Sequence, residues 1–131
     1  MELTFKVNGE RWDIAVTPAD VLLDVLREKI GVKGPKIGCE RGDCGSCTVL
    51  LDGKTVRSCL VLAVEVDGQE ITTVEGIGQE GMTRLQNLFL TLNAFQCGFC
   101  APGIVLSATE LLENNPNPTR HDVQEALAGT L

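Results

Sequence analysis

Three cysteines within nine residues are the part of this sequence best suited to chemistry. Cys39, Cys44 and Cys47 have the spacing C-x4-C-x2-C, and Cys59 follows after eleven intervening residues. This spacing is typical of plant-type [2Fe–2S] proteins, in which cysteine thiolates hold the cluster. The sequence therefore predicts one cluster at these four cysteines, which would pass electrons one at a time.

The residues between these cysteines suit an anionic cluster. Gly38, Gly42 and Gly45 stand beside the ligand positions, where glycine lets backbone N–H groups come close to the sulfurs. Arg41 can add positive charge, and donors near the sulfurs raise the reduction potential. A structural zinc site is the alternative, but zinc loops usually pair two separated cysteine knuckles. A zinc-stabilised interaction module is therefore the weaker interpretation.

A second cysteine pair, Cys97 and Cys100, forms a C-x2-C directly before an expected helix. The N-terminus of a helix stabilises an anionic cofactor through its free N–H groups and its dipole. Taken alone, the pair could be half of a zinc site or a dithiol redox pair. Two thiolates cannot complete a cluster, so this group needs further ligands.

The first half of the chain reads as strands that cross one helix. Alternating apolar residues flank two turn signals, Asn8-Gly9 and Asp52-Gly53, and predict strand pairs around them. Between these turns, a helix is expected from a threonine cap at residue 17 to a glycine at residue 31.

The second half reads as helices. Helical spacing of apolar residues predicts one helix after Thr83, one from Pro102 and one after Thr119. Strands in one half and helices in the other indicate an α+β chain with two domains, residues 1–76 and 77–131.

Charge and composition exclude several function classes. The net charge of −7 argues against nucleic acid as a partner, because phosphate binding needs clustered Lys and Arg. No stretch has the length of a membrane span, and the N-terminus lacks the pattern of a secretory signal, so a cytoplasmic protein is expected. Six cysteines in a reducing compartment favour metal binding over disulfides. Neither a Ser/His/Asp set nor a phosphate loop is evident, so substrate chemistry is assigned to a partner.

Several motifs occur together in one order over nearly the whole chain, at residues 38–49, 57–59, 96–100, 102–103 and 117–120. In this order the chain resembles the small iron–sulfur subunit of the molybdenum hydroxylases, the family of xanthine dehydrogenase, aldehyde oxidoreductase and carbon monoxide dehydrogenase. The resemblance implies a β-grasp, plant-type ferredoxin-like domain followed by a C-terminal α-helical bundle. Each of these domains would hold one [2Fe–2S] cluster.

The resemblance also implies a role in a larger complex. The chain would relay single electrons from the molybdopterin of a large subunit, through both clusters, to a flavin on an FAD-binding medium subunit or to another acceptor. Gln96 corresponds by motif position to a glutamine that hydrogen-bonds the pterin. Cys97 and Cys100 would be two ligands of the helical cluster, with a C-x-C segment past Leu131 supplying the others. We therefore expect the natural chain to continue past Leu131.

A free-standing soluble [2Fe–2S] ferredoxin is the alternative to a complex subunit. The helical half argues against it, because a lone carrier needs only the first domain. Co-purification with a large molybdenum subunit would separate the two hypotheses.

Overall fold

The computed structural model describes residues 1–130, and the first half of the chain forms a five-stranded mixed sheet in the order β2-β1-β5-β3-β4. β1 and β5 run parallel, and the other neighbours run antiparallel. Both predicted turns are confirmed, because Asn8-Gly9 and Asp52-Gly53 take positive φ between paired strands. The strands are β1 (Glu2–Val7), β2 (Glu10–Ala15), β3 (Thr48–Leu51), β4 (Lys54–Arg57) and β5 (Glu70–Thr72).

One helix crosses this sheet, but it begins later than predicted. α1 (Leu22–Asp24) continues directly into a π-helical segment (Val25–Ile30) that ends at Gly31 with φ 90°. The expected N-cap at Thr17 is wrong, because its backbone N–H and its hydroxyl both donate to the Asp20 carboxylate in a turn. The chain then makes sheet-like contacts before the helix starts, and the Leu22 N–H donates to Val61 O at 2.8 Å.

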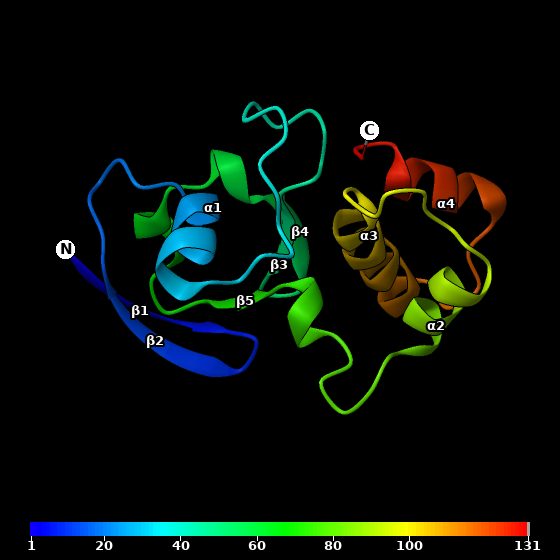
Figure 1. Ribbon diagram of the computed structural model, residues 1–131, viewed down its shortest axis with the longest axis horizontal. Coiled ribbons are helices and arrows are strands. Elements are labelled where there is room, and N and C mark those ends of the chain that lie inside the picture. The colour runs from blue at the N-terminus through cyan, green and yellow to red at the C-terminus, as the bar shows by residue number, and fades with distance from the viewer. Residues whose placement is uncertain (131) are drawn as a thin grey trace.

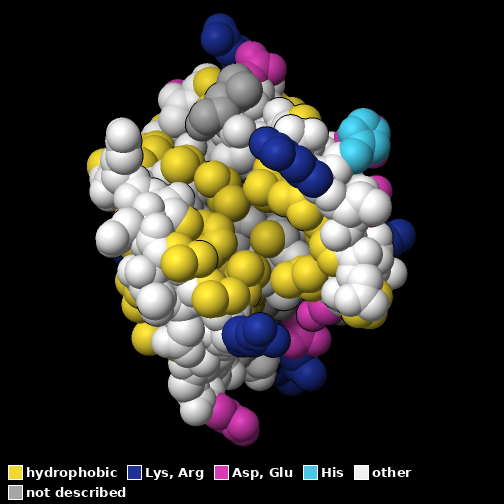
Figure 2. Space-filling view, turned by 90° about the vertical axis from the view of Figure 1, so that its right-hand side faces the viewer, with side chains coloured by type: hydrophobic (Ala, Val, Ile, Leu, Met, Phe, Trp, Pro, Cys, Tyr) yellow, Lys and Arg dark blue, Asp and Glu magenta, His cyan; other side chains and the backbone are white. Residues whose placement is uncertain are grey.

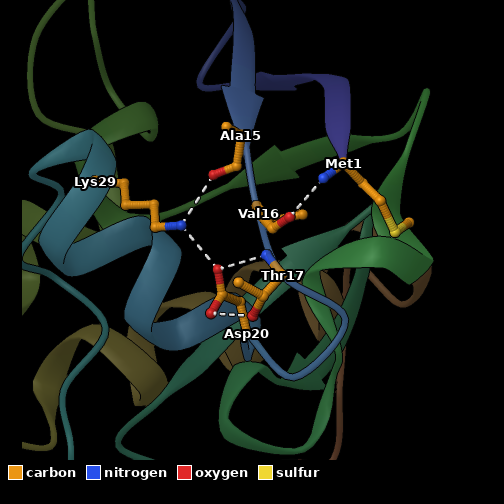
Figure 3. A network of polar contacts seen from close by, with 6 residues as sticks. All are labelled: Met1, Ala15, Val16, Thr17, Asp20 and Lys29. Atoms are coloured by element: carbon orange, nitrogen blue, oxygen red, sulfur yellow. Dashed lines mark hydrogen bonds and ion pairs between the residues drawn. The ribbon is translucent and has the colours of Figure 1, made fainter.

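Polar contacts fasten this helix to the edge of the sheet, as Figure 3 shows. The Lys29 ammonium donates to Ala15 O at 2.9 Å and to Asp20 Oδ2 at 2.7 Å. The N-terminal amine of Met1 donates to Val16 O at 2.9 Å. The end of the helix, the turn before it and the chain terminus are therefore joined at one place.

The hydrophobic core lies between the sheet and this helix. Three short 3₁₀ turns, Ser58–Leu60, Ala63–Val66 and Val74–Gly76, complete this half. The buried core residues are Leu3, Phe5, Val7, Val16, Leu22, Val25, Leu26, Val49, Ala63, Val66 and Ile71. Their burial supplies most of the force that holds the cysteine loop's scaffold together.

The second half contains α2 (Arg84–Thr91), α3 (Ala101–Asn114) and α4 (Arg120–Leu127). The predicted helix starts after Thr83 and Thr119 are confirmed, and each threonine forms a capping box with the residue three positions later. α3 begins one residue before the expected Pro102 and packs against β3 and β4 (Figure 1).

The α+β class is thus confirmed, with a mixed sheet followed by helices. Leu131, the last residue of the expected second domain, lies outside the described residues. Among residues 1–130, every helix is too short or too polar to cross a membrane.

Candidate metal centres

The loop that holds the first cysteines aims backbone N–H groups at a thiol. The N–H groups of Arg41, Asp43 and Cys44 lie 3.3–3.4 Å from Cys39 Sγ. These donors, with Arg41 N–H foremost, stabilise the thiolate and lower the pKa of Cys39 to about 6. A metal-binding thiol must be deprotonated, so the loop is already arranged for a thiolate ligand.

The four thiols of this group gather as two pairs. The Cys44 side chain contributes to the lowered pKa of Cys39, and the Cys47 side chain contributes to the raised pKa of Cys59. Burial raises the pKa of the Cys59 thiol to about 11, and the neighbouring Cys47 adds to the rise. Within residues 1–130, no three His, Cys, Asp or Glu side chains converge as a single metal ion would require.

Glycines give this loop its curvature. Gly42 and Gly45 have φ of 85° and 77°, a region that L-residues with side chains rarely occupy. Gly38 is needed for space, because a Cβ there would lie 2.6 Å from Cys44 Sγ. The glycines expected to suit a tight loop around sulfur are therefore placed where that loop bends or is crowded.

Arg41 contributes differently from expectation. Its guanidinium pairs with Asp43 at 2.8 Å, and both side chains are exposed. The positive charge expected at this position is therefore balanced by a neighbouring carboxylate. What Arg41 brings to the site is its backbone N–H on Cys39 Sγ.

Ser58 is a site residue that sequence reasoning missed. Its side chain is fully buried and its hydroxyl donates to Cys47 O at 2.6 Å, directly before Cys59. The bond ties the backbone of Cys47 to the residue directly before Cys59, although the two cysteines lie far apart in sequence. The only signal in the sequence is a small polar residue next to the fourth cysteine.

The second cysteine group lies directly before α3, as predicted. Cys100 stands at the N-cap position of α3, and Cys97 is exposed. Gly98, between them, has φ of 82° and turns the chain. Gln96 is exposed beside this turn.

Four cysteine thiols beside a loop with N–H donors aimed at sulfur, on a mixed sheet crossed by one helix, are typical of an iron–sulfur protein that carries electrons. Comparison with known families agrees. Residues 5–76 match the family described as a 2Fe-2S iron-sulfur cluster binding domain, and residues 73–131 match that described as a [2Fe-2S] binding domain. Both expected cluster-binding regions are thus present.

Relatives place the chain more closely. The nicotine 6-hydroxylase small subunit of Paenarthrobacter nicotinovorans is 49% identical over 131 residues, which are 100% of this chain and 79% of the relative. A probable xanthine dehydrogenase subunit of Bacillus subtilis is 40% identical, over 95% of this chain and 72% of the relative. Quinoline 2-oxidoreductase from Pseudomonas putida 86 superposes with a TM-score of 0.96 and 46% identity, over 100% of this chain and 82% of that chain.

The chain belongs to the family of small iron–sulfur subunits of the molybdenum hydroxylases. It carries electrons as a component of an oxidoreductase complex and is not a free-standing ferredoxin.

Proposed function

We propose that Cys39 and Cys44 bind one iron of a [2Fe–2S] cluster, and that Cys47 and Cys59 bind the other. The observation that carries this proposal is the loop that holds Cys39, Cys44 and Cys47 and aims three backbone N–H groups at Cys39 Sγ. The mutual effects of Cys39 with Cys44 and of Cys59 with Cys47 on their pKa values support the division into two pairs. A [2Fe–2S] cluster held by four cysteines needs two thiolates for each iron. When bound, the cluster supplies one-electron transfer.

The residues of the chain hold and tune this site. The three N–H groups on Cys39 Sγ stabilise negative charge on the sulfur, which favours the reduced form and raises the potential. The Ser46 N–H adds a similar contact to Cys44 Sγ at 3.5 Å. Cys47 is buried, so the part of the site that it forms is shielded from water.

We propose that Cys97 and Cys100 supply two ligands of a second [2Fe–2S] cluster. The chain has six cysteines and the first cluster uses four, so two remain for the second. The other two ligands would come from outside residues 1–131. The first turn of α3 offers its free N–H groups to the anionic centre.

Each half of the chain carries one of these sites and is assigned to a domain of its own. We propose residues 1–76 as a β-grasp, plant-type ferredoxin-like domain and residues 77–131 as part of a helical bundle domain. The mixed sheet crossed by one helix supports the first, and three helices, of which α2 and α3 carry exposed apolar side chains, support the second. A cytoplasmic location stays a prediction from the N-terminal sequence and the lack of a long apolar stretch.

The helical half offers an apolar surface to a partner. Figure 2 shows hydrophobic side chains gathered over the face of this half, and an apolar groove of about 310 Å³ lies there. Its lining includes Met82, Phe89, Leu90, Phe95 and Val105. An exposed apolar surface of this kind typically marks an interface. We propose that it is covered in the assembled complex, in part by a large molybdopterin-binding subunit.

The remaining partners follow from the family. We propose that electrons come from the molybdopterin of the large subunit and leave to an FAD-binding medium subunit or another acceptor. Gln96 would contact the pterin, because it is exposed beside Cys97 at the turn before α3. The names of the relatives point to nicotine hydroxylation and xanthine dehydrogenation in those proteins.

The ligand proposal is tested by removing one thiol from each group in the assembled complex. Cys44→Ala should abolish one electron paramagnetic resonance (EPR) signal of the reduced complex and lower its iron and sulfide content, while Cys100→Ala should abolish the other signal. Loss of both signals in each single variant, or stoichiometric zinc in the wild-type complex, would contradict the assignment.

The role of Gln96 is tested by Gln96→Ala, with Gln124→Ala on the exposed face of α4 as control. Gln96→Ala should leave both cluster spectra intact while it slows reduction of the clusters by substrate. An unchanged rate of cluster reduction in the correctly assembled variant would show that Gln96 does not contact the pterin.

A further inference from the structure

Three glycines meet where the two cysteine groups approach each other, and we call Gly45, Gly103 and Gly129 the glycine junction. A Cβ on Gly103 would lie 2.5 Å from Gly45 O, and a Cβ on Gly45 would lie 2.5 Å from Gly129 O. These neighbours are backbone atoms, which cannot swing aside as a flexible side chain can. The two halves of the chain therefore touch backbone to backbone.

The glycine junction lies between the proposed ligands of the two clusters. Gly45 directly follows Cys44, and Gly103 comes three residues after Cys100 in the first turn of α3. Figure 1 shows the cysteine loop, the start of α3 and the end of the described chain on the same side of the molecule. Alanine would be the better helix former at residue 103. Glycine is therefore explained by the close approach.

Arg57 joins the two halves beside the glycine junction. Its guanidinium donates to Thr48 Oγ1 at 2.6 Å, and it also donates to Gly129 O. The Thr48 hydroxyl in turn donates to Gly45 O at 2.6 Å. Thr48 is 1% exposed, so its bond to Gly45 O is protected from competing water, whereas the bond from Arg57 to Gly129 O is exposed. One planar side chain thus binds the first residue of β3, directly after the cysteine loop, and the segment that follows α4.

A second contact crosses between the two cysteine groups. The Lys36 ammonium lies 5.7 Å from the centroid of the Phe99 ring, within the range of a cation–π interaction. Phe99 stands between Cys97 and Cys100, and the Lys36 N–H donates to Ser46 O at 2.9 Å in the first loop. Lys36 thus connects the two cysteine loops, while Arg57 joins β3 to the segment after α4.

We propose that electrons pass between the two cysteine groups across the contact of Gly45 with Gly103, and that Arg57 is the positioning residue that holds this contact closed. The inference rests on the proposed function, because it needs a cluster at each group. One electron leaves the reduced cluster of one group and reduces the oxidised cluster of the other, so no bond forms or breaks. Because tunnelling falls steeply with distance, a close-packed contact without side chains keeps the crossing short.

The test uses the assembled complex with the full chain and four variants. Gly103→Ala widens the contact by about 1 Å if both backbones are to reach ordinary van der Waals separation. Arg57→Gln removes the clamp and the charge, whereas Arg57→Lys keeps the charge but loses the planar fork. Arg11→Gln is the control, because Arg11 is an exposed arginine on β2 whose ion pair is with Asp13.

Two measurements report on the glycine junction itself. The magnetic coupling between the two reduced clusters, seen as splitting of their EPR signals, falls with the cube of their separation. The rate at which electrons redistribute between the clusters after flash reduction measures electron transfer from one cluster to the other. Gly103→Ala, Arg57→Gln and Arg57→Lys should each keep both cluster signals, with reduced splitting and slower equilibration. Arg11→Gln should match the wild type.

Three outcomes would overturn the inference. Unchanged splitting and rate in Gly103→Ala would show that electrons cross elsewhere. Wild-type behaviour of Arg57→Lys would show that Arg57 acts only through its charge. If Gly103→Ala fails to assemble, unchanged splitting and rate in Arg57→Gln refute the clamp by themselves. Absence of one cluster signal from the wild-type complex would instead refute the proposed function.

Discussion

Ser58 offers a direct test of how the fold holds the first cluster site. Its hydroxyl is fully buried and donates to Cys47 O at 2.6 Å, while its own N–H lies 3.4 Å from the same oxygen. Ser58 therefore ties the segment that carries Cys59 to the loop that carries Cys47. Ser58→Ala removes the hydroxyl group and leaves the backbone unchanged.

The magnitude follows from what remains after the substitution. A net intramolecular hydrogen bond contributes about 0.5–1.5 kcal/mol, and a buried group left without a partner costs about 1–3 kcal/mol. Cys47 O keeps the longer bond from the Ser58 N–H, so it is not left without a donor. We therefore expect a loss of about 1 kcal/mol, which raises the population of opened states roughly fivefold.

The assay measures how fast the protein loses the cluster to an iron chelator, and the bleaching of visible absorption reports this loss. When opening is fast and reversible, the rate of loss follows the population of the open form, so Ser58→Ala should bleach about five times faster than wild type. Ser107→Ala is the control, because Ser107 is 8% exposed on α3 and lies in the other half of the chain. Equal bleaching rates in wild type and Ser58→Ala, or equal acceleration in Ser107→Ala, would refute the reasoning.

Three further predictions concern the scaffold. The carboxylate of Asp20 accepts a hydrogen bond from Lys29, which lowers the pKa of Asp20 to about 2. The stability that this carboxylate contributes is therefore present above about pH 4 and is lost as the pH falls toward 2. Asp20→Asn should lower the urea midpoint at pH 7, and its difference from the wild type should vanish toward pH 2. Leu26→Ala, at a fully buried core position, should cost about 2–5 kcal/mol in urea unfolding, and a cost below 1 kcal/mol would contradict tight packing. Thr83→Ala removes the cap of α2 and should cost about 1 kcal/mol, seen as faster amide exchange in α2 but not in α4.

Features set by neighbours in sequence could be predicted from the sequence. Asn8-Gly9 forms its turn because both residues accept positive φ, and Thr83 caps α2 through a residue three positions away. The start of α1 could not be predicted in this way. The N–H of Leu22 bonds to Val61, and the N–H of Ala63 bonds to Asp20 O, so contacts between distant segments delay the helix.

In the candidate site, too, local features could be predicted from the sequence and contacts between distant residues could not. The spacing of Cys39, Cys44 and Cys47 predicted a cluster, because the loop that binds it is local. The sequence did not predict that Cys59 pairs with Cys47, since eleven intervening residues and a strand hairpin separate them. The sequence analysis expected a free positive charge at Arg41, whereas Asp43 balances that charge in the structure. The ion pair could not be predicted, because charge pairing on an exposed loop has no characteristic spacing in the sequence.

The cysteine loop must meet two demands at once, which explains the positions of its glycines. It must curl around the proposed cluster, with N–H groups aimed at Cys39 Sγ, and it must also lie against α3 through Gly45. Gly42 meets the first demand and Gly45 meets both, since Gly45 has positive φ and no room for a Cβ. A substitution at Gly42 should therefore harm mainly the first cluster, whereas one at Gly45 should also disturb the fit of the helical half. The two glycines have similar φ, so this difference arises from packing between the halves rather than from the loop alone.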